Sequence, residues 1–452
     1  MLKRKFAVML GICSLLGVFC LSACTNKNDF GVVEESVETE SQSENGADTL
    51  EETVETGEET ETETSNVSSS SVVLYDTRQN DLTFTESVNR FNSALYKCMN
   101  FTDDNVVYSP YSLTTALAML DEMADGYTSM HIRMLLGISE LSQYTDGMKA
   151  LVDRYEGNGL VSANALYVQE GFAYADDSDA LVMLPLKQDF NAEIHEVDFV
   201  GHIEDVHKDI EKWVAKNTNN LIPDYKSIST SDTVSDLLNV LAFDAKWDVP
   251  FSANDTYTEE FHGTEGSTEV DMMHNHDRYL SYLDDFSGVR VIGLTYENGA
   301  EMDILLPVDE HASVHDVVSN IDMTELFTAL DNTEEERIKT LALPKVSTRV
   351  SLDSDVLKSA LDSLGLVDVF NENANFSKLS ENIYVGDISH ETVLNIDEEG
   401  TQAASVTEVV LDKAIAMPNE DGVDFIVNRP FAFVIRDSET NTILFTGEIN
   451  QL

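Results

Sequence analysis

The chain has 452 residues, of which 83 are Asp or Glu and 27 are Lys or Arg, so its formal net charge is −56 at neutral pH. Such a chain is a poor ligand for nucleic acid or an anionic polysaccharide, because polyanion binding needs clustered Lys and Arg. By length alone it could hold two or three average domains. It contains no GxSxG turn, HExxH helix or Walker loop, so nothing in its motifs indicates an enzyme.

The first 24 residues predict an export signal. A basic start, residues 3–5, precedes an apolar run at 6–21 that is too short to be a comfortable membrane span. The run ends in the sequence LSAC, which resembles the bacterial lipobox, whose cysteine is lipidated before cleavage. We expect residues 1–23 to be removed as a lipoprotein signal peptide and Cys24 to anchor the chain at the bacterial cell surface, where each buried methylene group contributes about 0.8 kcal/mol. The alternative is a plain secretory signal cut nearby.

Residues 24–75 predict a disordered acidic tether rich in Glu, Ser and Thr. Between residues 25 and 64 the chain has fourteen acidic residues and one lysine, a net charge of −13. Such a segment cannot bury enough apolar surface to offset the entropy lost on ordering. Self-repulsion extends it, which suits a stalk. A functional acidic binding tail is the alternative.

A strand followed by a hinge is predicted near the C-terminus. Residues 393–396 are mostly apolar, three acidic residues at 397–399 end the strand, and Gly400 supplies backbone freedom. The next residues alternate with a period of two, which fits a half-buried strand. One face is uncharged: Thr401, Ala403, Ser405, Thr407, Val409 and Leu411. The start of this segment is too small and too weakly apolar to hold a sheet on its own. An ordinary edge strand plus a surface loop is the simpler alternative.

The same residues resemble a known family. EEGTQAAS at 398–405, NRPFAF at 428–433 and FTGEIN at 445–450 are similar to motifs of the serpins, a family of suicide protease inhibitors. Three longer segments resemble the family in the same order: NVVYSPYSLTTALAML at 105–120, LLNVLAFDAKWDVPF at 237–251 and LPKVSTRVSLDSDVLKSALDSLGLVDVF at 343–370. The resemblance runs from about residue 80 to the C-terminus.

The resemblance implies an α+β fold with three β-sheets, about nine helices and an exposed reactive-centre loop at about 398–428. It makes residues 76–452 one serpin domain. It also implies a serine-type endopeptidase inhibitor and not an enzyme. The target protease cuts the loop and forms an acyl-enzyme, and the cut loop then inserts into the main sheet before hydrolysis is complete. The native state must therefore lie above its energy minimum.

The resemblance to serpins also implies roles for particular residues in loop insertion. The hinge comprises Glu398, Gly400, Thr401, Ala403, Ala404 and Ser405. A polar cluster beneath the opening strands comprises Ser109, Ser112, Asn239 and His390, and Trp247 marks the point where insertion begins. A charge at Thr401 would be buried unpaired, at a cost of several kcal/mol.

The position of the bait bond, the reactive bond that the protease is expected to cut, is found by counting residues from the hinge. Seventeen residues from Glu398 lead to Ala414, so the expected reactive bond is Ala414–Ile415, which suits elastase-like or subtilisin-like proteases. A hinge one residue shorter would place Lys413 in the primary pocket and favour trypsin-like enzymes. Met417 would need a longer insertion.

The expected partner is an extracellular serine protease in a covalent 1:1 complex. The protein is expected to be a monomer that can form loop–sheet polymers, without cofactor, metal or nucleic acid. No heparin binding is expected, because residues 127–154 offer only three cations, Arg133, Lys149 and Arg154. A non-inhibitory serpin acting as a surface binding or adhesion scaffold is the alternative function, and a binding protein that depends on its acidic stalk is a third.

A pair of nearby histidines and one cysteine are expected to have structural and not functional roles. His274, His276 and Asp277 could mimic a metal site, but we expect a solvated loop there. Cys98 is predicted on an amphipathic helix as a small buried hydrophobe. It is the only cysteine that would remain in the domain after Cys13 and Cys20 leave with the signal, so no disulfide within the domain is expected.

Overall fold

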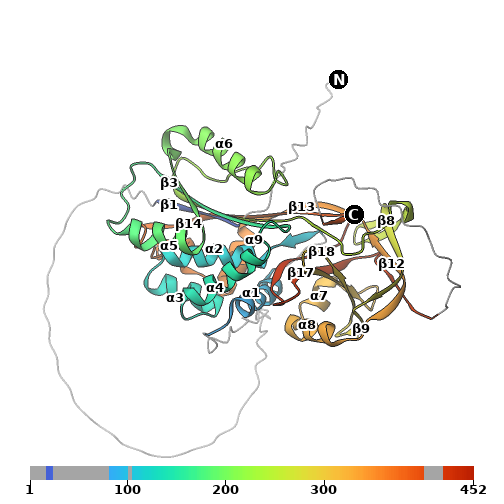
Figure 1. The fold of residues 1–452 in the computed structure, drawn as a ribbon. Coiled ribbons are helices and arrows are strands. Elements are labelled where there is room, and N and C mark those ends of the chain that lie inside the picture. The colour runs from blue at the N-terminus through green and yellow to red at the C-terminus, as the bar shows by residue number, and fades with distance from the viewer. Residues whose placement is uncertain (1–16, 24–80, 100–103, 402–420) are drawn as a thin grey trace, which may run out of the picture. The chain divides into compact units, whose positions relative to one another are not determined.

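The computed structural model describes residues 17–23, 81–99, 104–401 and 421–452 (Figure 1). All the helices and strands described below belong to one compact unit. Its described residues form nine α-helices: α1 Phe84–Cys98, α2 Pro110–Met123, α3 Gly126–Leu136, α4 Leu141–Arg154, α5 Leu184–Asp189, α6 Phe199–Asn217, α7 Val314–Val318, α8 Met323–Asn332 and α9 Ser354–Ser363.

The strands of the described residues form three sheets. The main sheet has the order β4-β3-β5-β1-β14-β15-β6, with β13 paired to β14: β4 Glu193–Val197, β3 Leu160–Gln169, β5 Thr233–Phe243, β1 Gly17–Ala23, β14 Ile383–Ile396, β15 Gly400–Thr401, β6 Ala245–Lys246 and β13 Val346–Leu352. The second has the order β2 Val106–Tyr108, β18 Ile443–Ile449, β17 Phe431–Asp437, β11 Ala300–Pro307, β10 Val289–Thr295 and β9 Tyr282–Phe286. The third has the order β16 Val423–Ile426, β12 Glu336–Pro344, β8 Gly266–Leu280 and β7 Thr256–Gly263.

The main sheet is covered on both faces. Helix α2 packs on one face and α6 on the other (Figure 1). Every residue of β5 is therefore buried, although the strand includes Asp236 and Asn239. Continuous burial is typical of a strand with both faces packed, and the polar side chains among these residues need partners inside the protein.

Helix α2 begins where the sequence supplies both a cap and a proline. The Ser109 hydroxyl accepts a hydrogen bond from the backbone N–H of Ser112, and Pro110 occupies the first turn. Proline is tolerated there because the N–H it lacks would have no partner within the helix. The helix is buried over nearly its whole length, so its polar side chains face other parts of the core.

The second sheet carries much of the remaining core. All residues of β11, β17 and β18 are buried. Strand β17 pairs with β18 and with β11, and β18 pairs with β2. The strand residues of the C-terminal motifs, 431–433 and 445–449, thus lie in the buried part of this sheet.

The α+β architecture with three sheets and nine helices confirms the predicted fold class. The predicted strand at 393–396 is the end of β14, and Gly400–Thr401 forms the short strand β15. Cys98 is the last residue of α1 and is half-buried, so it is less enclosed than predicted; its thiol is in no disulfide. Among the described residues, no helix is long and apolar enough to cross a membrane.

Candidate functional site: the hinge and the gap in the main sheet

The chain reverses direction between β14 and β15 through a tight turn. The backbone N–H of Asp397 donates to Gly400 O at 2.9 Å, and the Asp397 carboxylate accepts from the backbone N–H groups of Glu399 and Gly400 at 2.9 and 3.2 Å. The acidic residues that end the strand thus also shape the turn. It directs the chain back along β14, with Thr401 paired antiparallel to Ile396.

Gly400 is required by a close approach of two strands. Strand β15 lies between β14 and β6, and a Cβ atom at position 400 would lie 2.1 Å from the carbonyl oxygen of Ala245 in β6. Any side chain would push β6 away from the hinge. The glycine that sequence reasoning assigned to hinge flexibility therefore also permits the strand pairing.

Thr401 is already inside the protein. Its side chain is 4% exposed, and its hydroxyl lies 2.6 Å from the phenol oxygen of Tyr296. The Tyr296 ring stacks on Trp247, with ring centroids 4.4 Å apart. A small uncharged hydroxyl is satisfied in this position, whereas a charge would need a partner that Tyr296 cannot provide.

Trp247 holds the turn through two hydrogen bonds. Its indole N–H donates to Asp397 O at 3.0 Å, and its backbone N–H donates to Glu399 O at 2.9 Å. The residue predicted to mark the start of insertion therefore contacts the hinge directly. Its burial at 2% exposure fixes the indole in place.

Glu398 is fixed by a lysine that sequence reasoning did not single out. Lys345 Nζ lies 2.8 Å from Glu398 Oε2, and the Thr256 hydroxyl donates to Oε1 at 2.9 Å. Burial acts to raise the pKa of the Glu398 carboxyl, but the hydrogen bonds from Lys345 and Thr256 outweigh it, so the pKa lies below its ordinary value. The carboxylate stays charged and holds the base of the hinge.

The four predicted polar residues meet beneath the main sheet. The backbone N–H of Ser109 donates to His390 Nε2 at 3.0 Å, so this nitrogen is the acceptor and the ring is neutral. The Ser112 hydroxyl donates to Asn239 Oδ1. Asn239 Nδ2 in turn donates to Asn164 Oδ1 at 2.6 Å, which adds Asn164 of β3 to the cluster. Sequence reasoning missed Asn164, because one more asparagine in a strand gives no signal of its partner.

This cluster straddles a gap in the main sheet. Asn239 lies on β5 and His390 on β14, and the two strands are separated by β1. Strand β1 pairs with residues 233–239 of β5 and 383–389 of β14. In the described part of the chain, no strand joins β5 to β14 between these pairings and the short β15. A cavity lies there, lined by Leu221, Phe243, Val393, Leu394, Asn395, Thr401, Ile435 and Phe445.

Comparison with known proteins identifies the architecture. The serpin (serine protease inhibitor) family matches residues 86–452. The chain is a serpin. It is 31% identical over 371 residues to an uncharacterized serpin-like protein of Thermococcus kodakarensis, covering 80% of this chain and 84% of that protein. It is 30% identical over 387 residues to iripin-2 of Ixodes ricinus, covering 83% and 95%.

Solved structures agree with the fold. The native-state structure of the thermophilic serpin tengpin matches with a TM-score of 0.68 at 25% identity, covering 82% of this chain and 94% of that one. Thyroxine-binding globulin, solved with thyroxine, matches with a TM-score of 0.69 at 24% identity, covering 81% and 98%. The second likeness concerns the fold alone.

In this serpin an ion-pair bridge joins β13 and β14 to the connection between α6 and β5. Arg349 of β13 donates to Glu391 of β14 at 2.9 Å and to Asp224 at 2.9 Å. Asp224 lies in the connection between α6 and β5. Burial raises the pKa of the Glu391 carboxyl to about 7, against the opposing effect of Arg349. Leu221 of the same connection lines the cavity, so the bridge fixes a segment that forms part of the cavity wall.

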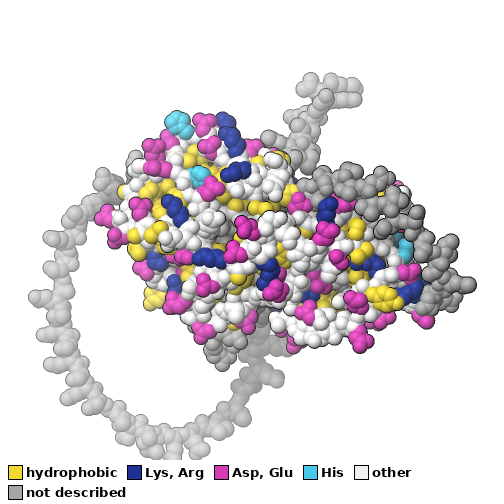
Figure 2. Space-filling model, in the orientation of Figure 1, with side chains coloured by type: hydrophobic (Ala, Val, Ile, Leu, Met, Phe, Trp, Pro, Cys, Tyr) yellow, Lys and Arg dark blue, Asp and Glu magenta, His cyan; other side chains and the backbone are white. Residues whose placement is uncertain are grey.

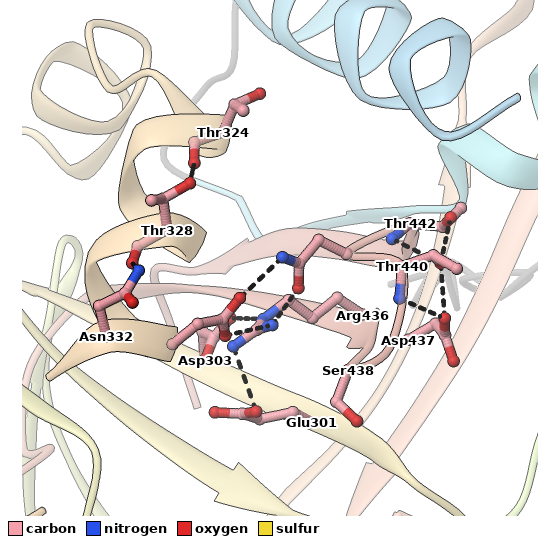
Figure 3. Close-up of polar contacts among 12 residues, drawn as sticks. Glu301, Asp303, Thr324, Thr328, Asn332, Arg436, Asp437, Ser438, Thr440 and Thr442 are labelled. Carbon is pink, nitrogen blue, oxygen red and sulfur yellow. Dashed lines mark hydrogen bonds and ion pairs between the residues drawn. The ribbon is translucent and has the colours of Figure 1, made fainter. Parts of the chain in front are cut away.

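A second charged cluster lies on β11 and β17 of the second sheet (Figure 3). Arg436 of β17 is 1% exposed and contacts Asp303 at 2.7 Å, Glu301 at 3.1 Å and Asp331 at 3.2 Å. Burial and the nearby Asp303 carboxylate raise the pKa of Glu301 to about 8, despite Arg436. The pKa of Asp303 is also raised by burial. The cluster ties α8 to β11 and β17, and we assign it to stability.

The remaining predicted residues are outside the described part of the chain or lie on other elements. The hinge residues Ala403, Ala404 and Ser405, the bait residues Lys413, Ala414 and Ile415, and Cys24 are outside the described residues. The prediction of a solvated loop at 274–277 is wrong: these residues lie in strand β8, which pairs with β12 there, and His274 is buried with its Nε2 3.3 Å from Glu259. Within the described ranges no group of His, Cys, Asp or Glu is arranged to hold a metal ion. Figure 2 shows acidic side chains across the visible face, with Lys and Arg interspersed among them.

Proposed function

We propose that this serpin is a suicide inhibitor of an extracellular serine protease of the elastase-like or subtilisin-like class. The observation that carries the proposal is the position of Thr401. It is buried, paired with the end of β14, and lines the cavity between β5 and β14. The chain therefore leaves β15 pointing along the gap that an inserted loop has to fill.

The register supports insertion by the uncharged face. Counted on from the Thr401–Ile396 pair, residues 403, 405 and 407 fall opposite Leu394, Thr392 and His390. These three β14 residues are buried at 3%, 1% and 0% exposure. The residues that would face them are Ala, Ser and Thr, whose size and lack of charge suit a closed interior.

The chemistry assigned to the loop is a diverted hydrolysis. The protease serine attacks the Ala414 carbonyl, the Ala414–Ile415 bond breaks, and Ile415 leaves as a new amino terminus. The acyl ester then holds the protease on Ala414 while the segment from Thr401 inserts. Ala414 fits a shallow apolar primary pocket. Lys413 remains the alternative bait residue and would redirect the inhibitor to trypsin-like enzymes.

We also infer that Cys24 is lipidated and that residues 24–75 tether the domain at the cell surface. The LSAC sequence and the acidic composition support this inference. Metabolic labelling with radioactive palmitate tests it. Label should enter the wild-type chain and be lost in Cys24→Ser, and label in the variant would contradict the assignment.

The inhibitory function is tested by mixing the protein with pancreatic elastase or subtilisin and resolving the products on a denaturing gel. A band at the summed mass of protease and inhibitor, stable in SDS, is expected. Clean loop cleavage without such a band, with trypsin-like enzymes also tried, would indicate a non-inhibitory scaffold instead.

A further inference from the structure

The gap beside β15 continues between β5 and β14 into a lower half, which is filled by the N-terminal part of the chain. Strand β1 lies between β5 and β14 and pairs antiparallel with both. Val18 lies opposite Leu238 on one side and Ser389 on the other. Both edges of β1 are therefore engaged, which is the arrangement of a central strand and not of a segment resting on a surface.

Strand β1 occupies the level at which the reactive loop would finish its insertion. Counted residue by residue from the Thr401–Ile396 pair, loop residue 408 falls opposite Ser389 and residue 414 opposite Ile383. These two β14 residues pair with Val18 and Ala23, near the two ends of β1. A loop entering from β15 would also run antiparallel to β14, in the direction that β1 takes.

The two occupants therefore compete for only part of the gap. The positions that loop residues 402–407 would take start at the cavity beside Thr401 and end at β1. No described strand occupies them, so the first part of the loop can enter. The positions of residues 408–414 are taken. Since the proposed bait residue is Ala414, the occupied part is the part needed to draw the acylated residue to the far end of the sheet.

We propose that the lower half of the gap is a binding site for the chain's own segment Gly17–Ala23, and that this segment and the fully inserted loop exclude each other. The exclusion rests on the inhibitory function proposed above. A chain that keeps Gly17–Ala23 in place is cut by the protease as a substrate, because insertion stops before the acyl-enzyme is distorted.

The end of β1 coincides with the predicted cleavage site of the signal peptide. Ala23 is the last residue of β1, and the predicted signal cut falls directly after it. That cut separates the strand from the domain, after which the seven-residue segment is held only by non-covalent contacts. The uncut precursor would be inactive, and processing at the membrane would make the gap available to the loop.

A native cysteine allows a direct test in the full chain. Cys20 lies opposite Asp387 of β14, so an Asp387→Cys substitution places two cysteines at paired positions on adjacent strands, and oxidation tests whether a disulfide joins them. Cys13, Cys24 and Cys98 are replaced by Ser, which leaves Cys20 as the partner and prevents lipidation. The matched control carries Asp309→Cys at an exposed turn after β11 instead.

Mild oxidation of the unprocessed chain should join Cys20 to position 387, seen as a linked peptide by mass spectrometry, and should leave the control unlinked. The oxidised chain should lose the SDS-stable complex, and reduction followed by removal of residues 1–23 should restore it. Failure to form the link in a folded chain would overturn the binding site. Undiminished trapping by the fully linked chain would overturn the exclusion. If the disulfide forms but neither the oxidised chain nor the reduced and processed chain traps protease, the inhibitory function is overturned and the binding of Gly17–Ala23 stays supported.

Discussion

If this serpin traps proteases as we propose, replacing Thr401 with arginine should turn it into a protease substrate. The Thr401 side chain is 4% exposed and its hydroxyl is 2.6 Å from Tyr296. Burying an unpaired guanidinium in this position costs about 3–5 kcal/mol. Because Thr401 is buried in the uncut chain too, the cost falls on insertion when the uncut variant holds residue 401 out of β15. The insertion step then slows by roughly a factor of 100 to 4,000, because each 1.4 kcal/mol corresponds to about tenfold in rate. Deacylation would then finish first.

The measurement is the number of inhibitor molecules consumed per protease trapped, determined by titration of protease activity and by gel. Thr401→Arg should be cut at the normal bond with little or no SDS-stable complex. Gln402→Arg is the matched control, because it adds the same charge one residue along, on the face predicted to meet solvent, and it should keep most of the trapping. Thr401→Ser should behave like the wild type. Wild-type stoichiometry in Thr401→Arg would refute the assignment of the hinge.

Three further predictions concern the hinge, the buried charges and the bait. Gly400→Ala should lower the melting temperature and weaken trapping, because its Cβ would lie 2.1 Å from Ala245 O; a variant that melts and inhibits like the wild type would contradict the close approach. The pKa of Glu301 is raised to about 8 from an ordinary 4.5, so between these two pH values the folded state holds a proton that the unfolded chain releases. The contribution of this carboxyl to the free energy of unfolding is therefore full below about pH 4.5 and is lost as the pH rises toward 8. Glu301→Gln should therefore gain stability relative to the wild type as the pH rises through this window in urea titrations, and a constant difference would argue against the shift. Ala414→Arg should move trapping from elastase to trypsin, and sequencing of the released fragment should find Ile415 first; a fragment that begins at Ala414 would assign the bait to Lys413.

The strand end and the turn at the predicted hinge could be predicted because their signals are local. A strand that ends in acidic residues, a glycine and an alternation of small residues can be read without knowing what they contact. The polar residues beneath the sheet could be named only through the family resemblance. Their hydrogen bonds, such as that between Ser109 and His390, join residues 281 positions apart.

The electrostatic contacts could not be predicted in the same way. With 83 acidic residues in the chain, neither the pairing of Lys345 with Glu398 nor that of Arg349 with Asp224 stands out in the sequence. Each depends on strands and connections brought together only by the complete fold. Position in the sheet, not residue type, decides which carboxylates are paired.

Strand β1 is the clearest difference between the sequence interpretation and the structure. An apolar run after a basic start is typical of an export signal, and that composition carries no information about a partner. The same apolar residues can form a strand once β5 and β14 offer hydrogen-bonding edges on both sides. The two interpretations are compatible, because export and strand formation concern different stages of the chain.

The central claim is that the loop of the mature chain inserts into the main sheet after it is cut. The most direct measurement is the melting temperature of the chain lacking residues 1–23, before and after the loop is nicked by a protease that escapes trapping. The account predicts a marked rise, because the inserted segment adds a central strand with hydrogen bonds on both edges. An unchanged melting temperature, with the cut verified by mass spectrometry, would contradict it.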